Sequence, residues 1–228
     1  MCGRFTLRTP ATVLTRQLLL DLGVEAPADL RPRFNIAPTQ MIAAVREVSP
    51  GDRTFDWLRW GLVPSWAKDV SIGNRMVNAR AETVAEKPAF RDAFRRRRCL
   101  VLADGYYEWR KEGSKKQPYY IRMADESPFA FAGLWERWSP GGSNDAVLET
   151  CTLITTDANE VTRPIHDRMP VILSPTEYVL WLNPEFRDPR ALLPLLKPYE
   201  AGEMIAVPVT PYVNNPKHDD PACLKAVG

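Results

Sequence analysis

Cysteine and histidine are scarce in this sequence of 228 residues. The four cysteines are widely separated and include no CxxC pair, and only two histidines accompany them. These residues are Cys2, Cys99, Cys151, Cys223, His166 and His218. Structural zinc sites need closely spaced Cys and His ligands, and disulfide scaffolds need many cysteines in a short chain. We therefore predict neither a metal site nor a disulfide framework.

Long apolar runs and a large net charge are also missing. No apolar stretch is long enough to cross a bilayer, and the first residues do not show the basic-then-apolar pattern of a secretory signal. We therefore expect a protein without membrane contact, cytoplasmic in a bacterium. The formal net charge is only +2, which barely indicates a nucleic-acid partner. We expect the one basic run, residues 95–98, to be a solvated face, with nucleic-acid binding as the alternative.

Many short strands and a few helices are predicted from the pattern along the chain. Hydrophobic residues make up 45% of the sequence, enough for one sizeable core, so we predict a single domain over residues 1–228. Strands and helices alternate without a regular βαβ period, which favours an α+β fold. We expect a mainly antiparallel, barrel-like β-sheet core with flanking short helices.

The expected elements follow from hydrophobic periodicity and from turn residues. Strands are predicted over residues 2–7, 41–48, 54–60, 99–103, 106–110, 119–123, 129–135, 147–155 and 204–209, and helices over 10–21, within 81–97, over 175–182 and over 189–196. Residues 31–38 hold two prolines, which exclude a regular helix, and we expect an irregular stretch there. Residues 111–117 are expected to join a long hairpin, and 141–145 to form a loop.

Cys2 follows the initiator Met1, and removal of the methionine would leave both its thiol and its α-amine free. The amine titrates near pH ~7.7–8.0 and the thiol near ~8.5, so both supply some nucleophile at neutral pH. An aldehyde could condense with the amine to an imine, after which the thiol closes a thiazolidine ring; an acyl group would meet only the thiolate. The alternative is that Cys2 is simply the small, half-buried start of a strand.

Three polar residues lie where a site could need an acid, a base or a hydrogen-bond donor. Glu108 is flanked by aromatics, so burial would raise its pKa, whereas an alternating strand could instead turn it to solvent. His166 has charged neighbours, Asp167 and Arg168, that could set its protonation, although a lone histidine is commonly structural. Asn78 could act in a site or cap the helix predicted after it.

Six segments in this order resemble the SRAP family, the SOS-response-associated peptidases, understood as abasic-site processing proteins. They are MCGRF at residues 1–5, NIAP at 35–38, WGLVPSW at 60–66, NARAET at 78–83, GYYEW at 105–109 and HDRMP at 166–170. The resemblance covers the chain from Cys2 to about Pro175 and extends weakly to residues 213–215. It implies a single SRAP domain, no cofactor and a monomer associated with the nucleoid at sites of damage.

The resemblance also implies catalytic roles. Cys2 is similar to the family's mature N-terminal nucleophile, which forms a thiazolidine crosslink with the ring-opened aldehyde of an abasic site. Asn78 matches the asparagine that hydrogen-bonds the adduct, and Glu108 matches the carboxylate that transfers protons. His166 matches the histidine near the opened sugar. Release of Met1 by autoproteolysis, abasic-site lyase activity and self-reversal of the crosslink are further implied activities.

The implied partner is single-stranded DNA containing abasic sites, including sites at single-to-double-strand junctions. The residues that match the family's DNA interface are Arg4, Pro38, Trp66, Arg80, Trp109 and Thr155. Arginine would hold phosphates and aromatic rings would stack on bases. Where some members carry a second aromatic after Trp66, this chain has Ala67, so one stacking contact is expected to be missing.

Two other classes of function remain open. An N-terminal-nucleophile amidotransferase also begins with a cysteine whose α-amine acts as base, but its glutamine-binding arginine and oxyanion-hole segment find no match here. A non-covalent module that binds single-stranded nucleic acid could use the same arginines and tryptophans without any reaction. Ammonia release from glutamine would indicate the first, and equal binding to intact and abasic strands the second.

Overall fold

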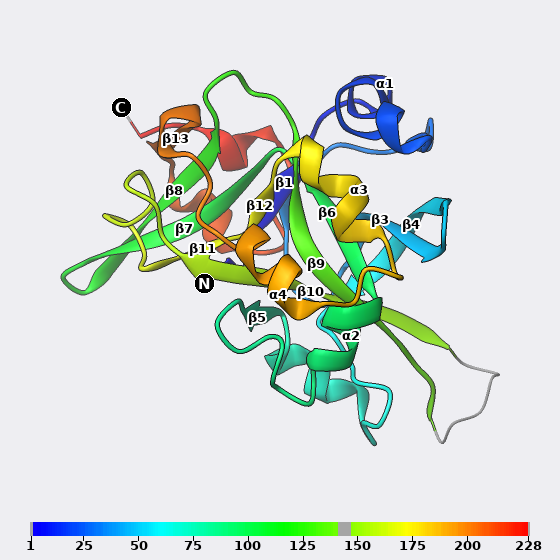
Figure 1. The fold of residues 1–228 in the computed structure, drawn as a ribbon. Coiled ribbons are helices and arrows are strands. Elements are labelled where there is room, and N and C mark those ends of the chain that lie inside the picture. The colour runs from blue at the N-terminus through cyan, green and yellow to red at the C-terminus, as the bar shows by residue number, and fades with distance from the viewer. Residues whose placement is uncertain (1, 141–146, 228) are drawn as a thin grey trace.

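Strands from distant parts of the chain close into a ring at the centre of the computed structural model, which describes residues 2–140 and 147–227 (Figure 1). Around the ring the order is β10–β4–β3–β6–β9, and β9 pairs with β10 again. Its members are β3 (Met41–Ser49), β4 (Asp52–Trp60), β6 (Arg98–Ala103), β9 (Phe129–Trp138) and β10 (Leu148–Asp157). All pairs are antiparallel except β10 with β4. The expected α+β fold with a barrel-like, mainly antiparallel core is confirmed.

Three short strands extend the ring next to β10 and β9. β5 (Asn78–Arg80) runs parallel to β10, β11 (Arg168–Pro170) runs antiparallel to it, and β12 (Ile172–Leu173) pairs with β9. β10 is therefore bordered by segments that come from two distant parts of the sequence. This arrangement brings Asn78 and the turn that contains His166 to the same side of the ring.

A second, antiparallel sheet has the order β13–β8–β7–β1–β2. Its strands are β1 (Phe5–Leu7), β2 (Arg33–Ile36), β7 (Gly105–Glu112), β8 (Lys115–Met123) and β13 (Met204–Pro208). The chain passes from the ring to this sheet at Asp104, between the end of β6 and the start of β7. β1 pairs with β7 with Phe5 opposite Tyr106, so the N-terminal residues lie along the strand that carries Glu108.

Helical segments are short and cover the outside of the sheets. They are α1 (Ala11–Leu14), η1 (Thr15–Leu19), η2 (Leu20–Leu22), η3 (Val70–Arg75), α2 (Arg91–Arg96), η5 (Pro175–Glu177), α3 (Tyr178–Leu182), α4 (Pro189–Leu192), η6 (Leu193–Leu195), η7 (Ala201–Glu203), η8 (Pro211–Asn214) and η9 (Pro221–Leu224). α1, η1 and η2 form one continuous run that ends at Gly23, whose φ of 68° is the left-handed conformation common at helix ends. Among the described residues, no helix is long and apolar enough to span a bilayer.

Several element boundaries differ from the sequence-based expectations. Residues 33–36, expected to be irregular, form β2, because pairing with β1 supplies hydrogen bonds that no local pattern reveals. Residues 2–4 precede β1 and are not strand. Residues 81–90 form turns, since Pro88 interrupts the expected helix, and only α2 is helical. β7 and β8 continue through residues 111–117 to a tight turn. The loop expected at residues 141–145 lies outside the described residues.

Asp104 ties the start of the chain to the junction between the two sheets. Its side chain is buried and accepts hydrogen bonds from the Thr6 hydroxyl at 2.5 Å, the Arg8 backbone N–H at 2.6 Å and the Thr9 backbone N–H at 2.7 Å. A buried carboxylate needs such donors, because its desolvation would otherwise be costly. The contacts fix β1, and with it the residues just before β1, against β7.

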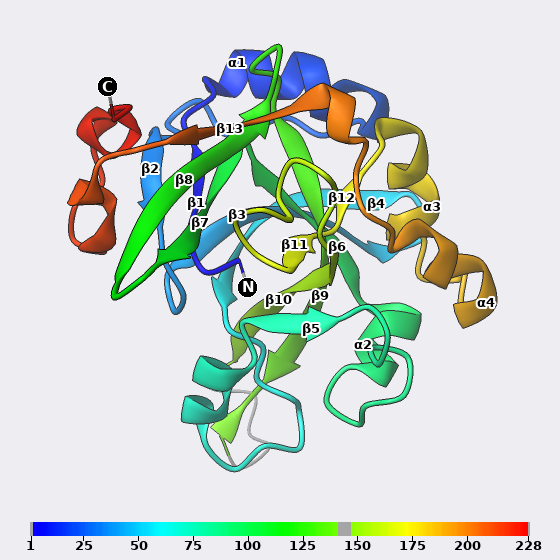
Figure 2. The same cartoon turned by 90° about the vertical axis from the view of Figure 1, so that its left-hand side faces the viewer.

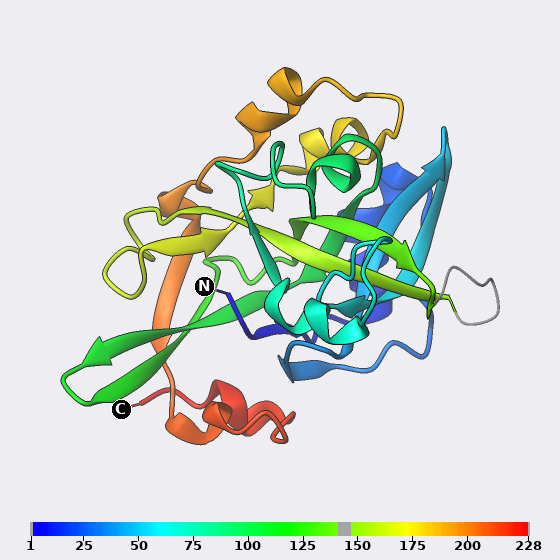
Figure 3. The same cartoon turned by 90° about the horizontal axis from the view of Figure 1, so that it is seen from below.

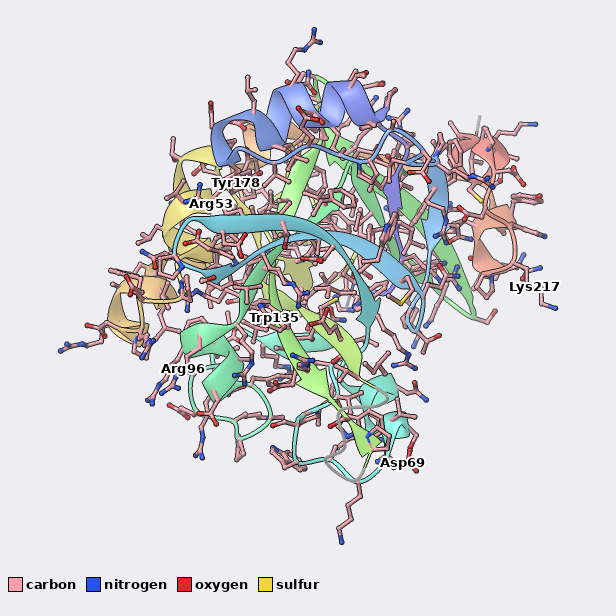
Figure 4. The ribbon with its side chains drawn as sticks, turned by 90° about the vertical axis from the view of Figure 1, so that its right-hand side faces the viewer. Arg53, Asp69, Arg96, Trp135, Tyr178 and Lys217 are labelled. Carbon is pink, nitrogen blue, oxygen red and sulfur yellow. The ribbon has the colours of Figure 1, made fainter. Side chains whose placement is uncertain are left out.

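Arg98 corrects the expectation that residues 95–98 are a solvated face. Its guanidinium is buried and donates to the backbone carbonyls of Trp181 at 2.6 Å, Phe94 at 2.8 Å and Phe186 at 2.9 Å, and also to that of Asn183. Burial lowers the pKa of Arg98 to about 10, so the group stays charged at neutral pH. Arg95 and Arg96 are exposed on α2, where Figure 4 labels Arg96.

Replacing Arg98 by methionine is expected to destabilise the protein by about 3–5 kcal/mol, because several buried hydrogen bonds to a charged donor are lost at about 1.5–3 kcal/mol each and the new side chain recovers part of this by apolar packing. Four carbonyls would lose their donor in a place that water reaches poorly. Urea unfolding followed by tryptophan fluorescence measures the change. Arg95→Met is the control and should change the free energy of unfolding by less than about 0.5 kcal/mol. Equal effects of the two substitutions would contradict the structural role of Arg98.

Candidate active site around Cys2

Cys2 lies where the second sheet meets the ring. In Figure 2 the segment that leads into β1 runs between β7 on one side and β5, β10 and β11 on the other. Cys2 is fully buried. Its carbonyl accepts a hydrogen bond from Asn78 Nδ2 at 2.8 Å. Two residues further on, the Arg4 carbonyl accepts a hydrogen bond from the Tyr107 backbone N–H at 2.9 Å. β5 and β7 thus fix Cys2 from two sides.

The surroundings of the Cys2 thiol keep it protonated. Burial raises its pKa far above the ordinary value, and the nearby Glu108 carboxylate raises it further. Cys2 Sγ lies 3.9 Å from the Arg4 carbonyl oxygen, a weak contact in which the thiol is the donor. A thiol in this state becomes nucleophilic only when a neighbouring group takes its proton.

Glu108 is such a neighbour. It is 2% exposed in β7, so the alternative in which it faces solvent is wrong. Burial raises the pKa of its carboxyl, and the positive charge of His166 acts in the opposite direction. Glu108 therefore interacts electrostatically with both Cys2 and His166. A carboxyl with a raised pKa can both accept and donate a proton close to neutral pH.

Asn78 is the first residue of β5 and does not cap a helix. Its side-chain nitrogen holds the Cys2 carbonyl, while its buried Oδ1 has no hydrogen-bond partner among the described residues. Buried polar atoms are rarely left in this state, and an exception commonly marks a place where a ligand or water binds. The oxygen can accept an N–H from a group that forms beside Cys2.

His166 borders two cavities. Its side chain is 30% exposed, and Nδ1 lies 3.0 Å from the donating Arg168 backbone N–H and 2.8 Å from Asp167 Oδ1. The first contact uses the lone pair of Nδ1 and the second needs a proton on the same atom, so only one of the two can form as a hydrogen bond at a time. One cavity, of about 420 Å³, also contains Glu108 and Trp109 in its lining. The other, of about 590 Å³, also contains Arg80 and Arg163.

Arg4 and Trp109 lie at the first cavity but are held by the C-terminal segment. The Arg4 guanidinium donates to Asn35 Oδ1 at 2.9 Å, the Val213 carbonyl at 2.9 Å and the Asn214 carbonyl at 3.3 Å. Trp109 Nε1 donates to Asn214 Oδ1 at 2.7 Å. Figure 3 shows the C-terminal segment, in which η8 contacts β8 and η9 contacts β2. Arg4 therefore has a structural role besides any contact with a ligand.

The other residues expected at a DNA interface differ in exposure. Trp66 is 60% exposed in the loop after β4, Pro38 is half-buried in the turn between β2 and β3, and Arg80 is exposed at the second cavity. The expectation that the Thr155 side chain contacts DNA does not fit its position. Thr155 is fully buried in β10, and its hydroxyl donates to the Ala79 carbonyl at 3.3 Å. Its role in this structure is to hold β5 against β10, since a fully buried side chain offers no surface to DNA.

Sequence reasoning missed two polar residues, one at the first cavity and one on the strand that carries Glu108. Lys116 of β8 lines the first cavity. Tyr106 is buried two residues before Glu108 on β7, so both side chains lie on one face of that strand. The alternation of a strand was the available signal for Tyr106, whereas only the β7–β8 pairing places Lys116. Within residues 2–140 and 147–227, no group of His, Cys, Asp or Glu side chains could hold a metal ion.

A family model described as SOS response associated peptidase (SRAP) matches residues 1–216. The chain belongs to the SRAP family. This SRAP chain is 43% identical over 227 residues to the abasic site processing protein YoqW of Bacillus subtilis, covering 99% of this chain and 100% of that relative. It is 33% identical over 204 residues to the abasic site processing protein HMCES of Xenopus tropicalis, covering 80% of this chain and 60% of that protein.

The fold of this SRAP chain also occurs in a crystal structure of a protein from Bacteroides thetaiotaomicron. The TM-score is 0.85 at 29% sequence identity, covering 99% of this chain and 100% of the other. The SRAP chain and that protein therefore share the whole arrangement of the ring and the second sheet. The resemblance seen in the six segments of the sequence is confirmed at the level of the family.

Proposed function

We propose that this SRAP chain processes abasic sites in DNA by capturing the ring-opened aldehyde covalently through Cys2. The observation that carries the proposal is the position of Cys2, which is held between Asn78 and Glu108 beside the cavity that His166 borders. Relatives that match almost the whole chain are named abasic site processing proteins. An aldehyde is the functional group that an N-terminal cysteine traps better than any other residue.

The reaction begins with release of Met1, which frees the Cys2 α-amine. The amine adds to the aldehyde carbon to give a carbinolamine, which loses water to form an imine. The thiol then adds across the C=N bond: sulfur bonds to carbon, and the thiol proton ends on nitrogen. The product is a thiazolidine, and no oxidant or reductant is required. Holding the two nucleophiles beside the aldehyde replaces a bimolecular step by an intramolecular one, worth up to ~10⁵–10⁸ M in effective concentration.

Three side chains assist these steps. Glu108 in its acid form donates a proton to the departing hydroxyl, and in its base form it takes the thiol proton during ring closure. Asn78 Oδ1 accepts the N–H of the amine and later that of the ring. His166, which borders both cavities, exchanges a proton with the sugar oxygen as the deoxyribose opens. The same bases can remove a C2′ proton from the imine, so that the 3′ phosphate leaves; this is the lyase reaction.

Basic and aromatic groups on both sides of His166 offer a path for a single DNA strand. Arg4 and Lys116 lie at the first cavity, and Arg80 and Arg163 at the second. Such groups neutralise phosphates. The exposed Trp66 is suited to stacking on a base. An abasic site has no base to unstack, so its opened sugar can enter the cavity at lower cost than an intact nucleotide.

The proposal is tested by incubating the Met1-processed protein with a single-stranded oligonucleotide that carries one abasic site, followed by heating and denaturing electrophoresis. A shifted band with the abasic strand and none with an intact strand of the same sequence is the expected result. Equal non-covalent binding to both strands without a shifted band would instead support a simple binding module. Ammonia release from glutamine would support an amidotransferase.

A further inference from the structure

Tyr106 is a buried polar side chain that the proposed chemistry has not yet used. It lies in β7, is fully buried, and its hydroxyl has no hydrogen-bond partner among the described residues. Most buried hydroxyls in proteins are paired, and an unpaired one destabilises the fold. A tyrosine retained in such a place, where phenylalanine would fit, indicates that the hydroxyl acts on something other than the fold.

The two faces of β7 place Tyr106 on the same side as the reactive groups. Tyr106 and Glu108 alternate with Tyr107, which packs in a separate cluster against the C-terminal segment. Tyr106 belongs instead to the same buried cluster as Cys2. Its ring lies edge-on to that of Phe131 in β9, with centroids 6.1 Å apart, so the ring direction is fixed by packing. A rigid ring holds its hydroxyl in one place.

The electrostatic environment of Tyr106 identifies its neighbours. Burial raises the pKa of the phenol well above its ordinary value, and the charges of Cys2 and Glu108 raise it further, with Cys2 acting more strongly than Glu108. The phenol therefore stays protonated wherever the protein is folded and can serve as a donor. Tyr106 and Glu108 of β7 are the titratable side chains that interact electrostatically with Cys2. His166 interacts electrostatically with Glu108.

We propose that the Tyr106 hydroxyl donates a hydrogen bond to the Cys2 sulfur as the thiol loses its proton, which makes Tyr106 a further catalytic residue. Glu108 takes the proton, sulfur bonds to the imine carbon, and the proton passes to the ring nitrogen. Tyr106 keeps its own proton throughout and stabilises the negative charge on sulfur between these events. The inference rests on the proposed function of Cys2 and adds a donor that neither Asn78 nor Glu108 supplies to sulfur.

The test uses Tyr106→Phe in the Met1-processed protein. Alkylation of Cys2 by iodoacetamide is followed at the N-terminal peptide by mass spectrometry from about pH 6 to 10. We expect the alkylation rate to fall about tenfold at each pH in this range, as for loss of one hydrogen bond to a charged group. Crosslinking to abasic DNA should slow by a similar factor. The melting temperature should stay the same or rise, because an unpaired buried hydroxyl is removed.

Tyr178→Phe is the matched control, since Tyr178 is a buried tyrosine at the start of α3, outside the lining of both cavities. It should leave the alkylation profile and the crosslinking rate unchanged. Superimposable alkylation profiles for Tyr106→Phe and the wild type would overturn the inference, as would a fall in melting temperature with no fall in the alkylation rate. If the wild type forms no crosslink at all, the proposed function fails, while the alkylation profile still reports on Tyr106 and Cys2.

Discussion

Cys2→Ser is expected to lose the heat-stable DNA adduct, with a fall of at least about 10³-fold in the rate of its formation. Serine keeps the α-amine, so the imine can still form, but a hydroxyl is too weak a nucleophile to close the ring. The large effective concentration of the intramolecular thiol is then lost, and the imine hydrolyses when the sample is heated. Denaturing electrophoresis with the abasic oligonucleotide measures the loss directly.

Chemical reduction of the imine distinguishes the contribution of the Cys2 amine from that of the Cys2 thiol. Cyanoborohydride should restore a covalent band with Cys2→Ser, because it converts the imine to a stable amine. A protein in which Met1 is retained should give no heat-stable band without reductant, since the α-amine of Cys2 is then part of a peptide bond and no thiazolidine can form. Cys223→Ser is the control, because Cys223 is buried in the C-terminal cluster, and it should crosslink like the wild type. A heat-stable band from Cys2→Ser without reductant would contradict the proposed chemistry.

The barrel-like fold was predictable because its strands are marked locally. The buried run of β6 and the polar segment that joins β7 and β8 as a hairpin are visible in the sequence. The closure of the ring was not, since the parallel contact of β10 with β4 joins residues about ninety positions apart, such as Cys151 and Trp60. Pairing over such distances depends on tertiary packing, which also explains why β2 was missed.

The site was predicted only in part, because local sequence features do not show which distant segments pack together. Glu108 could be expected to be buried because aromatics flank it, and Cys2 could be expected to react because of its position after Met1. The family resemblance suggested that Asn78 acts beside Cys2, whereas its hydrogen bond to the Cys2 carbonyl depends on the pairing of β5 with β10 and was not predicted. Thr155 shows the limit of such a transfer, because a matching position gave no information on exposure. The DNA-contact roles of Arg4, Pro38, Trp66, Arg80 and Trp109 stay predictions.

Glu108→Gln is expected to slow crosslinking about 10²-fold, within the usual range for loss of general acid–base catalysis. Glutamine fills the same space but can neither take the thiol proton nor protonate the departing hydroxyl. Because burial raises the pKa of Glu108, the wild-type rate should rise with pH through a limb above the ordinary carboxyl range. In the variant that limb should disappear, leaving only the titration of the α-amine. Single-turnover crosslinking rates from about pH 5 to 9 measure both effects.

The pH dependence of the free energy of unfolding distinguishes a loss of proton transfer in Glu108→Gln from misfolding of the variant. A carboxyl whose pKa is raised in the folded protein stabilises the fold at low pH, and this contribution is lost as the pH rises through the folded-state pKa. Glutamine removes the titration, so Glu108→Gln should become more stable relative to the wild type as the pH rises. Glu136→Gln is the matched control, since Glu136 is also buried with a raised pKa but pairs with Arg97 at 2.7 Å. It should crosslink at the wild-type rate; an equal loss in both variants would mean that Glu108 acts through the fold and not as the proton carrier of Cys2.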